Sequence, residues 1–193
     1  MRHAPAERGV DRVSRTGHNP DVQTATRVRV VGCGRGLRRD DQIGLRVAER
    51  LADLSLDGDV EVTASEAPAA DVLLAAADVS LLVLIDAVAE SPQLPGGGWR
   101  RLDLLNPSAG DPRPVVPEGA AMSPHMLGLS AGLELARRLG MLPKAVWLYV
   151  VAGRDFGYGE GMTTGVADAI REVASAIQRD LRQHLRRGGG EHA

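Results

Sequence analysis

The feature that most constrains the fold is a run of five apolar residues, Leu81 to Ile85, which ends at Asp86. An uninterrupted apolar run of this length predicts a strand buried on both faces of a sheet. Other strand-like segments occur at 27–31, 60–63, 99–105 and 145–151, and helical patterns separate most of them. This alternation predicts a single α/β domain, in which helices cover both faces of a mostly parallel sheet.

Helical spacing predicts where those helices lie. A first helix is expected to start near Asp41, with Asp40 or Asp41 as its N-cap, and an alanine-rich helix is expected over 68–77. Ser123 and Pro124 resemble the start of a third helix. A long last helix is expected from about Thr163, with one apolar face made of Val166, Ile170, Val173, Ile177 and Leu181.

Length and composition predict one domain with two tails. A chain of 193 residues can bury one sizeable core. Residues 1–26 and 188–193 contain too few apolar side chains to pack, so both are predicted to be disordered tails. The folded domain is therefore expected to span 27–187.

Charge and hydropathy argue against several classes of partner. A net charge of −2 does not suit electrostatic binding to nucleic acid. The sequence contains neither an apolar stretch of about 20 residues, as a membrane span requires, nor a secretion signal. The single cysteine excludes an internal disulfide. The expected location is the cytoplasm, without nucleic-acid or membrane partners.

Three groups of residues are expected to converge at the carboxyl ends of the strands, where parallel sheets place their sites. They are the segment 32–44, Asp86 at the end of its strand, and His125 at the start of a helix. Asp41, Asp86 and His125 could together bind a borderline divalent cation such as nickel or zinc. The helix dipole would keep His125 neutral, as a metal ligand must be.

The same residues also have simpler interpretations. Asp41 could be only a helix cap, Asp86 could cap a loop, and His125 could be a surface residue. The glycines at 32, 34 and 36 could cradle a nucleotide phosphate, although the acidic pair after them would repel one. Alternatively, these glycines allow a sharp turn and a close backbone approach.

Cys33 is a further candidate, as a nucleophile with His125 as base and Asp86 to orient it. A lone cysteine at the end of a buried strand is more often a small apolar filler, and that interpretation is favoured.

Four segments, in order, resemble the motifs of the hydrogenase maturation endopeptidase family. The first resembles that family's Gly-x-Gly-Asn, acidic pair and amphipathic helix, and the last resembles its loop into the final helix. The four segments are Val31–Leu51, Leu84–Val88, Met122–Leu129 and Phe156–Val166. The resemblance covers about residues 27–181 and implies a three-layer α/β/α fold around a twisted five-stranded sheet.

The resemblance also implies a reaction. Asp41, Asp86 and His125 would form a metal-contacting, catalytic trio in an aspartic-type endopeptidase. The trio would engage nickel already carried by the precursor of a hydrogenase large subunit, whose C-terminal extension is then removed. Zinc or cadmium could substitute for nickel in a crystal, and the protein is expected to be a monomer or weak homodimer.

The sequence departs from the family pattern at three places. Arg35 stands where the family usually has Asn, Gln42 where a small residue is usual, and Gly153–Asp155 where Gly-x-Glu-Pro is common. The departures at Arg35 and Gly153–Asp155 motivate one alternative, a homologue that binds an immature hydrogenase subunit without cutting it. The glycines at 32, 34 and 36 motivate another, a nucleotide-binding α/β protein.

Overall fold

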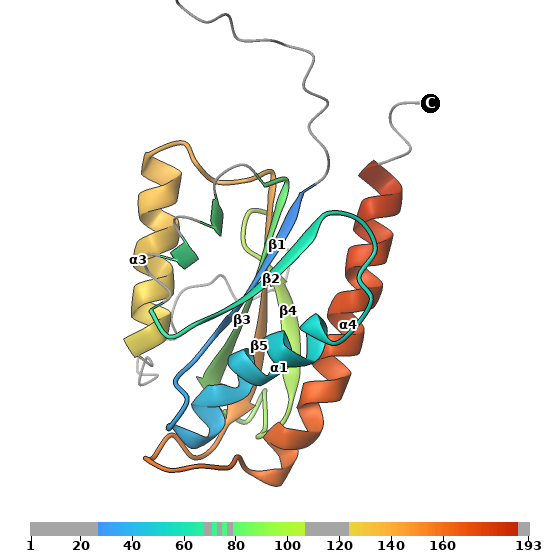
Figure 1. Ribbon diagram of the computed structural model, residues 1–193. Helices are drawn as coiled ribbons and strands as arrows, with labels where there is room; N and C mark the ends of the chain where they lie inside the picture. Colours follow the sequence, from blue (N-terminus) through green and yellow to red (C-terminus); the bar gives the residue numbers. More distant parts are fainter. Residues whose placement is uncertain (1–26, 68–70, 73–74, 77–78, 107–123, 189–193) are drawn as a thin grey trace, which may run out of the picture.

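A computed structural model describes residues 27–67, 71–72, 75–76, 79–106 and 124–188, and only the backbone of 124–128. Its centre is a five-stranded sheet in the order β2-β1-β3-β5-β4 (Figure 1). The strands are β1 (Val28–Cys33), β2 (Val60–Ser65), β3 (Leu81–Ala89), β4 (Trp99–Asp103) and β5 (Ala145–Gly153). All neighbouring pairs are parallel except β4 with β5. The predicted fold class is confirmed.

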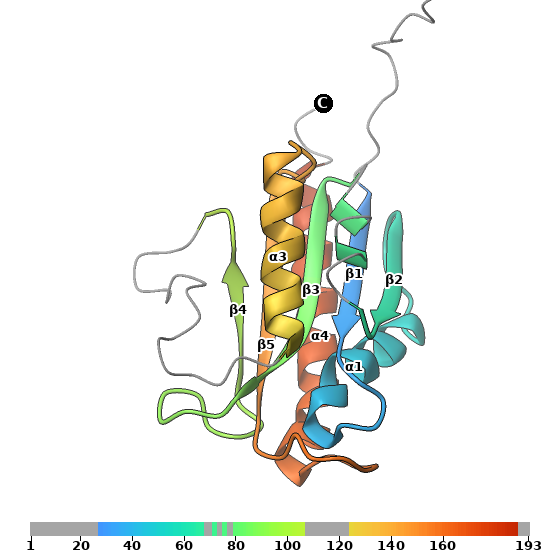
Figure 2. The same ribbon diagram turned by 90° about the vertical axis from the view of Figure 1, so that its left-hand side faces the viewer.

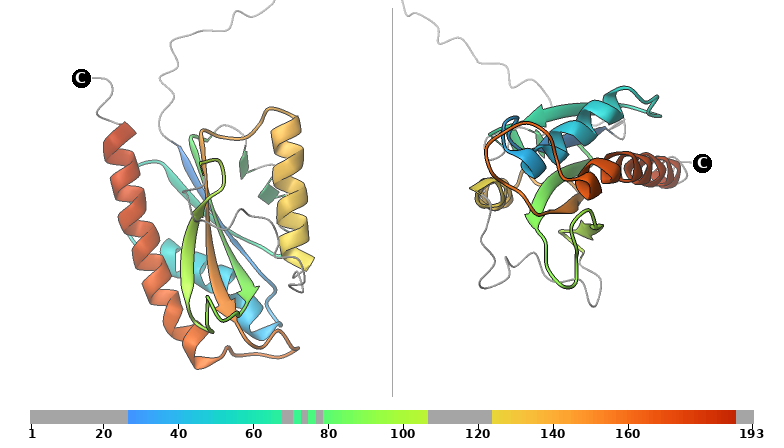
Figure 3. Two further views of the ribbon diagram at one scale, coloured as in Figure 1. Left: turned by 180° about the vertical axis from the view of Figure 1, so that it is seen from behind. Right: turned by 90° about the horizontal axis from the view of Figure 1, so that it is seen from below.

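Two helices cover one face of the sheet, and a third covers the other. Helices α1 (Ile43–Ala52) and α4 (Thr164–Gly188) lie side by side on one face, while α3 (Pro124–Arg138) lies on the opposite face (Figures 2 and 3). The predicted apolar face of α4 is buried against the sheet through Val166, Val173, Ile177 and Leu181. Each such side chain contributes about 1.5–3 kcal/mol on burial.

The central strand β3 is longer than predicted. The apolar run Leu81–Ile85 is fully buried, as expected, but the strand continues to Ala89. Its pairing with β1 stops at Ile85, whereas its pairing with β5 continues to Ala89 opposite Gly153. Asp86 is therefore inside β3 rather than at its end, at the level where β1 leaves the ladder.

The prediction that Asp40 or Asp41 caps the first helix is wrong. Both residues belong to a short 3-10 helix, η1 (Arg39–Gln42), and α1 begins only at Ile43. The residue in the N-cap position of α1 is Gln42, and no side chain makes a capping hydrogen bond there. The acidic side chains point instead to tertiary neighbours, which are described below.

Several predictions fall partly or wholly outside the described residues. They are the tail 1–26, much of the alanine-rich segment 68–77, the cap Ser123 and the end of the chain after 188. Residues 71–72 and 75–76 are helical. Within the part of the chain that the structure describes, no helix has the length and hydropathy needed to span a bilayer.

Candidate active site at the ends of β1 and β3

Glycines allow the backbone of η1 and α1 to lie directly against the ends of β1 and β3. A Cβ atom added at Gly34 would be 2.1 Å from the carbonyl oxygen of Asp41. A Cβ added at Gly44 would be 2.1 Å from the oxygen of Cys33 and 2.5 Å from that of Ile85. These contacts account for the glycines through close packing, and they fix Asp41 above the sheet.

The two adjacent acids have different environments. Asp40 is fully buried, and its carboxylate accepts hydrogen bonds from the backbone N–H groups of Arg154 (2.8 Å), Asp155 (3.0 Å) and Thr163 (2.7 Å), and from the Thr163 hydroxyl (3.0 Å). Burial alone would raise the pKa of Asp40, but these hydrogen bonds outweigh it and lower the pKa. Asp40 is thus an anchor between η1 and the loop before α4.

Sequence reasoning missed this role of Asp40. Three of its four donors are backbone N–H groups, which any residue except proline supplies, so no residue pattern in the sequence signalled it. Gly153 is required there, since a Cβ atom at this position would be 2.8 Å from Cβ of Asp40. Asp40 is thus engaged with the loop before α4, whereas the charge of its neighbour Asp41 acts on Asp86.

Asp86 is a completely buried carboxylate. Its Oδ1 accepts a 2.8 Å hydrogen bond from the N–H of Ala87, and no donor within the described part of the chain reaches Oδ2. Burial raises the pKa of Asp86 to about 7, opposed by the Ala87 hydrogen bond and assisted by the negative charge of Asp41. The two predicted site acids therefore lie within electrostatic reach of each other.

The predicted third member, His125, lies in the first turn of α3, which begins at Pro124. This end of α3 lies at the same edge of the sheet as the start of α1 (Figures 1 and 2). Asp86 alternates with Ile85 and Ala87, which face α1 and α4, so its side chain is on the α3 face. The side chain of His125 is outside the described atoms, and the described side chains alone form no cluster of three potential metal ligands.

Cys33 has the properties of an apolar filler. Its side chain is fully buried among residues of the α3 face, with Sγ 3.9 Å from the carbonyl oxygen of Val31. Burial, and then the charges of Asp86 and Asp71, raise the pKa of the thiol well above its usual value. A buried neutral thiol is a poor nucleophile, which favours the packing role.

The fold of the chain resembles that of several proteins of known structure. No family model and no curated protein sequence matches the chain. Among solved structures, the hydrogenase-maturating endopeptidase HybD from E. coli is 26% identical, with a TM-score of 0.67 over 82% of this chain and 93% of that one. The solution structure of an endopeptidase from Escherichia coli has the same identity and coverage, with a TM-score of 0.70.

A third solved structure extends this likeness to an archaeon. The hydrogenase 2 maturation peptidase from Thaumarchaeota archaeon SCGC_AB-539-E09 is 25% identical, with a TM-score of 0.55 over 80% of this chain and 97% of that one. The match covers between 93% and 97% of each of these structures. The chain therefore shares its fold with hydrogenase maturation endopeptidases, to which it is 25–26% identical.

Proposed function

We propose that this protein is an endopeptidase that removes the C-terminal extension from the precursor of a hydrogenase large subunit after nickel has been inserted. One observation carries the proposal: the buried carboxylate of Asp86 lies within electrostatic reach of Asp41, in a fold shared with hydrogenase maturation endopeptidases. The protein would act in the cytoplasm, as a monomer or weak homodimer.

The electrostatics of the two acids favour a cation between them. The negative charge of Asp41 disfavours ionisation of the buried Asp86, and Oδ2 of Asp86 is a buried acceptor without a donor among the described groups. Leaving such an acceptor unsatisfied costs about 1–3 kcal/mol. A divalent cation would neutralise the pair and occupy that acceptor.

Nickel in this reaction belongs to the substrate. Asp41 and Asp86 would supply oxygen ligands and His125 a nitrogen ligand, a donor set that suits nickel and would also accept zinc or cadmium. Bound there, the ion would polarise the scissile carbonyl or the attacking water. The protein itself would orient the precursor, and recognition of its nickel would restrict cutting to precursors that are already loaded.

The test is mass spectrometry of a nickel-loaded precursor incubated with the protein. The unmodified protein should remove a C-terminal peptide, whereas Asp41→Asn, Asp86→Asn and His125→Ala should each slow removal by about 100-fold or more. Asp168→Asn, at an exposed position of α4, is the matched control and should cut normally. Full activity of all three site variants, each shown by circular dichroism to be folded, would contradict the site assignment.

A second candidate function is a non-cutting partner of an immature hydrogenase subunit. The departures at Arg35, Gln42 and Gly153–Asp155 favour it, because they lie in or beside the segments that hold the acidic pair. Tight binding of the loaded precursor without any loss of mass would support this function. Cleavage by the purified protein would eliminate it.

A further inference from the structure

Two loops at the carboxyl edge of the sheet are joined into one exposed surface, here called the rim, made of residues 35–39 and 155–160. The N–H of Arg39 donates to the oxygen of Gly159 (3.3 Å), and the N–H of Gly159 donates to the oxygen of Leu37 (3.1 Å). These two bonds form an isolated parallel bridge between Arg38 and Gly159, outside the main sheet. The rim is therefore a braced structure rather than two separate loops.

The rim exposes two large side chains that packing would normally hide. Tyr158 is 76% exposed and Leu37 is 59% exposed, and the bridge between Arg38 and Gly159 joins the segments that carry them. The other exposed large hydrophobic residues of the described chain, Leu105, Leu135 and Leu139, belong to β4, α3 and the segments just after them. A paired apolar exposure beside a candidate site is typical of a surface that binds a partner.

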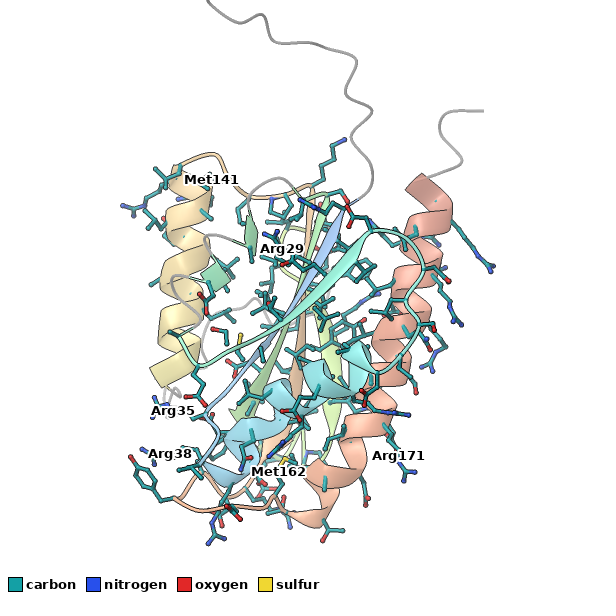
Figure 4. All side chains as sticks on the ribbon, viewed as in Figure 1. Arg29, Arg35, Arg38, Met141, Met162 and Arg171 are labelled. Atoms are coloured by element: carbon teal, nitrogen blue, oxygen red, sulfur yellow. The ribbon has the colours of Figure 1, made fainter. Side chains whose placement is uncertain are left out.

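Arg38 adds a fixed positive charge to this apolar pair. Its guanidinium carbon lies 4.0 Å from the centre of the Tyr158 ring, and its Nη1 donates to the oxygen of Phe156 at 3.3 Å. Among the described residues no carboxylate pairs with Arg38, whereas Arg39 forms a 2.8 Å ion pair with Asp155. Arg35 and Arg38 both lie at this end of the molecule (Figure 4).

The rim is connected to Asp40 and Asp41 in two ways: residues 35–39 directly precede them in the chain, and backbone hydrogen bonds link them to both rim segments. The N–H of Asp41 donates to the oxygen of Arg38 (2.9 Å), and the N–H of Asp40 donates to the oxygen of Asp155 (2.9 Å). A chain segment bound on the rim would thus be held within a few residues of Asp41. Because the rim adjoins Asp41, a molecule bound there would lie next to the candidate active site.

We infer that the rim binds the C-terminal extension of the precursor, through an apolar side chain on Leu37 and Tyr158 and a carboxylate on Arg38. The inference rests on the proposed function, since it names the part of the substrate that this surface recognises. Charge complementarity supports it, because a C-terminal extension always ends in an α-carboxylate and Arg38 offers a cation held in place. The apolar pair supplies the contact area, and the cation orients the segment.

Steady-state processing of a nickel-loaded precursor tests the inference. Leu37→Ser, Tyr158→Ser and Arg38→Gln should each raise KM about fivefold or more and leave kcat within about twofold, as expected when a contact that is equally strong in the ground state and the transition state is lost. Leu139→Ser is the matched control, because Leu139 is 57% exposed but follows the last turn of α3, away from the rim. Unchanged KM in the three rim variants would overturn the inference even if the protein cuts the precursor.

A binding titration separates failure of this inference from failure of the proposed function. If the unmodified protein does not cut, its affinity for the loaded precursor is measured directly, and a fivefold or greater loss in the Leu37→Ser/Tyr158→Ser variant would support the rim alone. Equal affinity of that variant, or no binding at all, would overturn it. Replacing the acidic side chains of the extension by amides tells whether Arg38 pairs with one of them or with the terminal carboxylate.

Discussion

At the residue scale, the two adjacent aspartates of the site have different roles. Asp40 accepts four hydrogen bonds from the loop before α4, whereas the charge of Asp41 acts on Asp86. The acid that stabilises the fold and the acid proposed for chemistry are thus neighbours in the chain. A neutral residue at position 40 should therefore lower stability, whereas a neutral residue at position 41 should lower activity.

Asp40→Asn should destabilise the protein by about 3 kcal/mol at pH 7, because charge-assisted hydrogen bonds to a buried carboxylate are lost. The pKa of Asp40 is lowered in the folded state, so its contribution is present above the unfolded value of 3.8 and is lost as the pH falls below it. In urea unfolding, the free energy of unfolding of Asp40→Asn should therefore lie well below that of the unmodified protein at pH 7, and the difference should become smaller near pH 3. An equal difference in the free energy of unfolding at pH 7 and at pH 3 would contradict this role of Asp40.

At the element scale, close backbone contacts position the segment that carries Asp41. Gly34 lies against the backbone of Asp41, and Gly44 lies against the ends of β1 and β3. A phosphate-binding turn would instead lead directly into a helix, but α1 starts only at Ile43. The element boundary and the contacts both favour packing as the purpose of the glycines.

Gly34→Ala should lower the free energy of unfolding by about 1–3 kcal/mol, because its methyl group has no room beside the carbonyl of Asp41. Gly36→Ala is the control, since the nearest atom to its added Cβ is a Glu66 carboxylate oxygen at 3.1 Å, at the end of a flexible side chain. Thermal or urea unfolding of the two variants measures the difference. Equal stabilities would mean that the η1 segment can move away from β1 at little cost.

At the scale of the whole molecule, the site is assembled from parts that are distant in the sequence. Asp41 follows β1 and Asp86 lies in β3, and the strand order β2-β1-β3 places these two strands next to each other. From β1 the chain first continues to β2 on one side of it, and then returns to β3 on the other side. The strand order therefore reverses at β1 and β3. Such a switch point is where α/β sheets bind their ligands.

If these acids bind a cation, then a cation should stabilise the whole domain. Zinc at tenfold its Kd would add about 1.4 kcal/mol by mass action and raise Tm by about 3–5 °C. The Asp86→Asn variant should show a much smaller shift, because it lacks the buried carboxylate. Differential scanning fluorimetry with zinc or nickel measures both shifts, and an equal rise in both proteins would show that the cation binds elsewhere.

The sequence predicts the fold class, the approximate positions of the strands, the apolar face of α4 and a buried central strand at 81–85 that leads to Asp86. These follow from local periodicity and apolar runs, which are properties of neighbouring residues. The contacts of the folded chain establish that Asp40 is an anchor, that β3 continues past Asp86, and that the segments carrying Leu37 and Tyr158 are joined. Each of these depends on contacts between segments far apart in the chain, such as Asp40 with Thr163, and no local pattern encodes them.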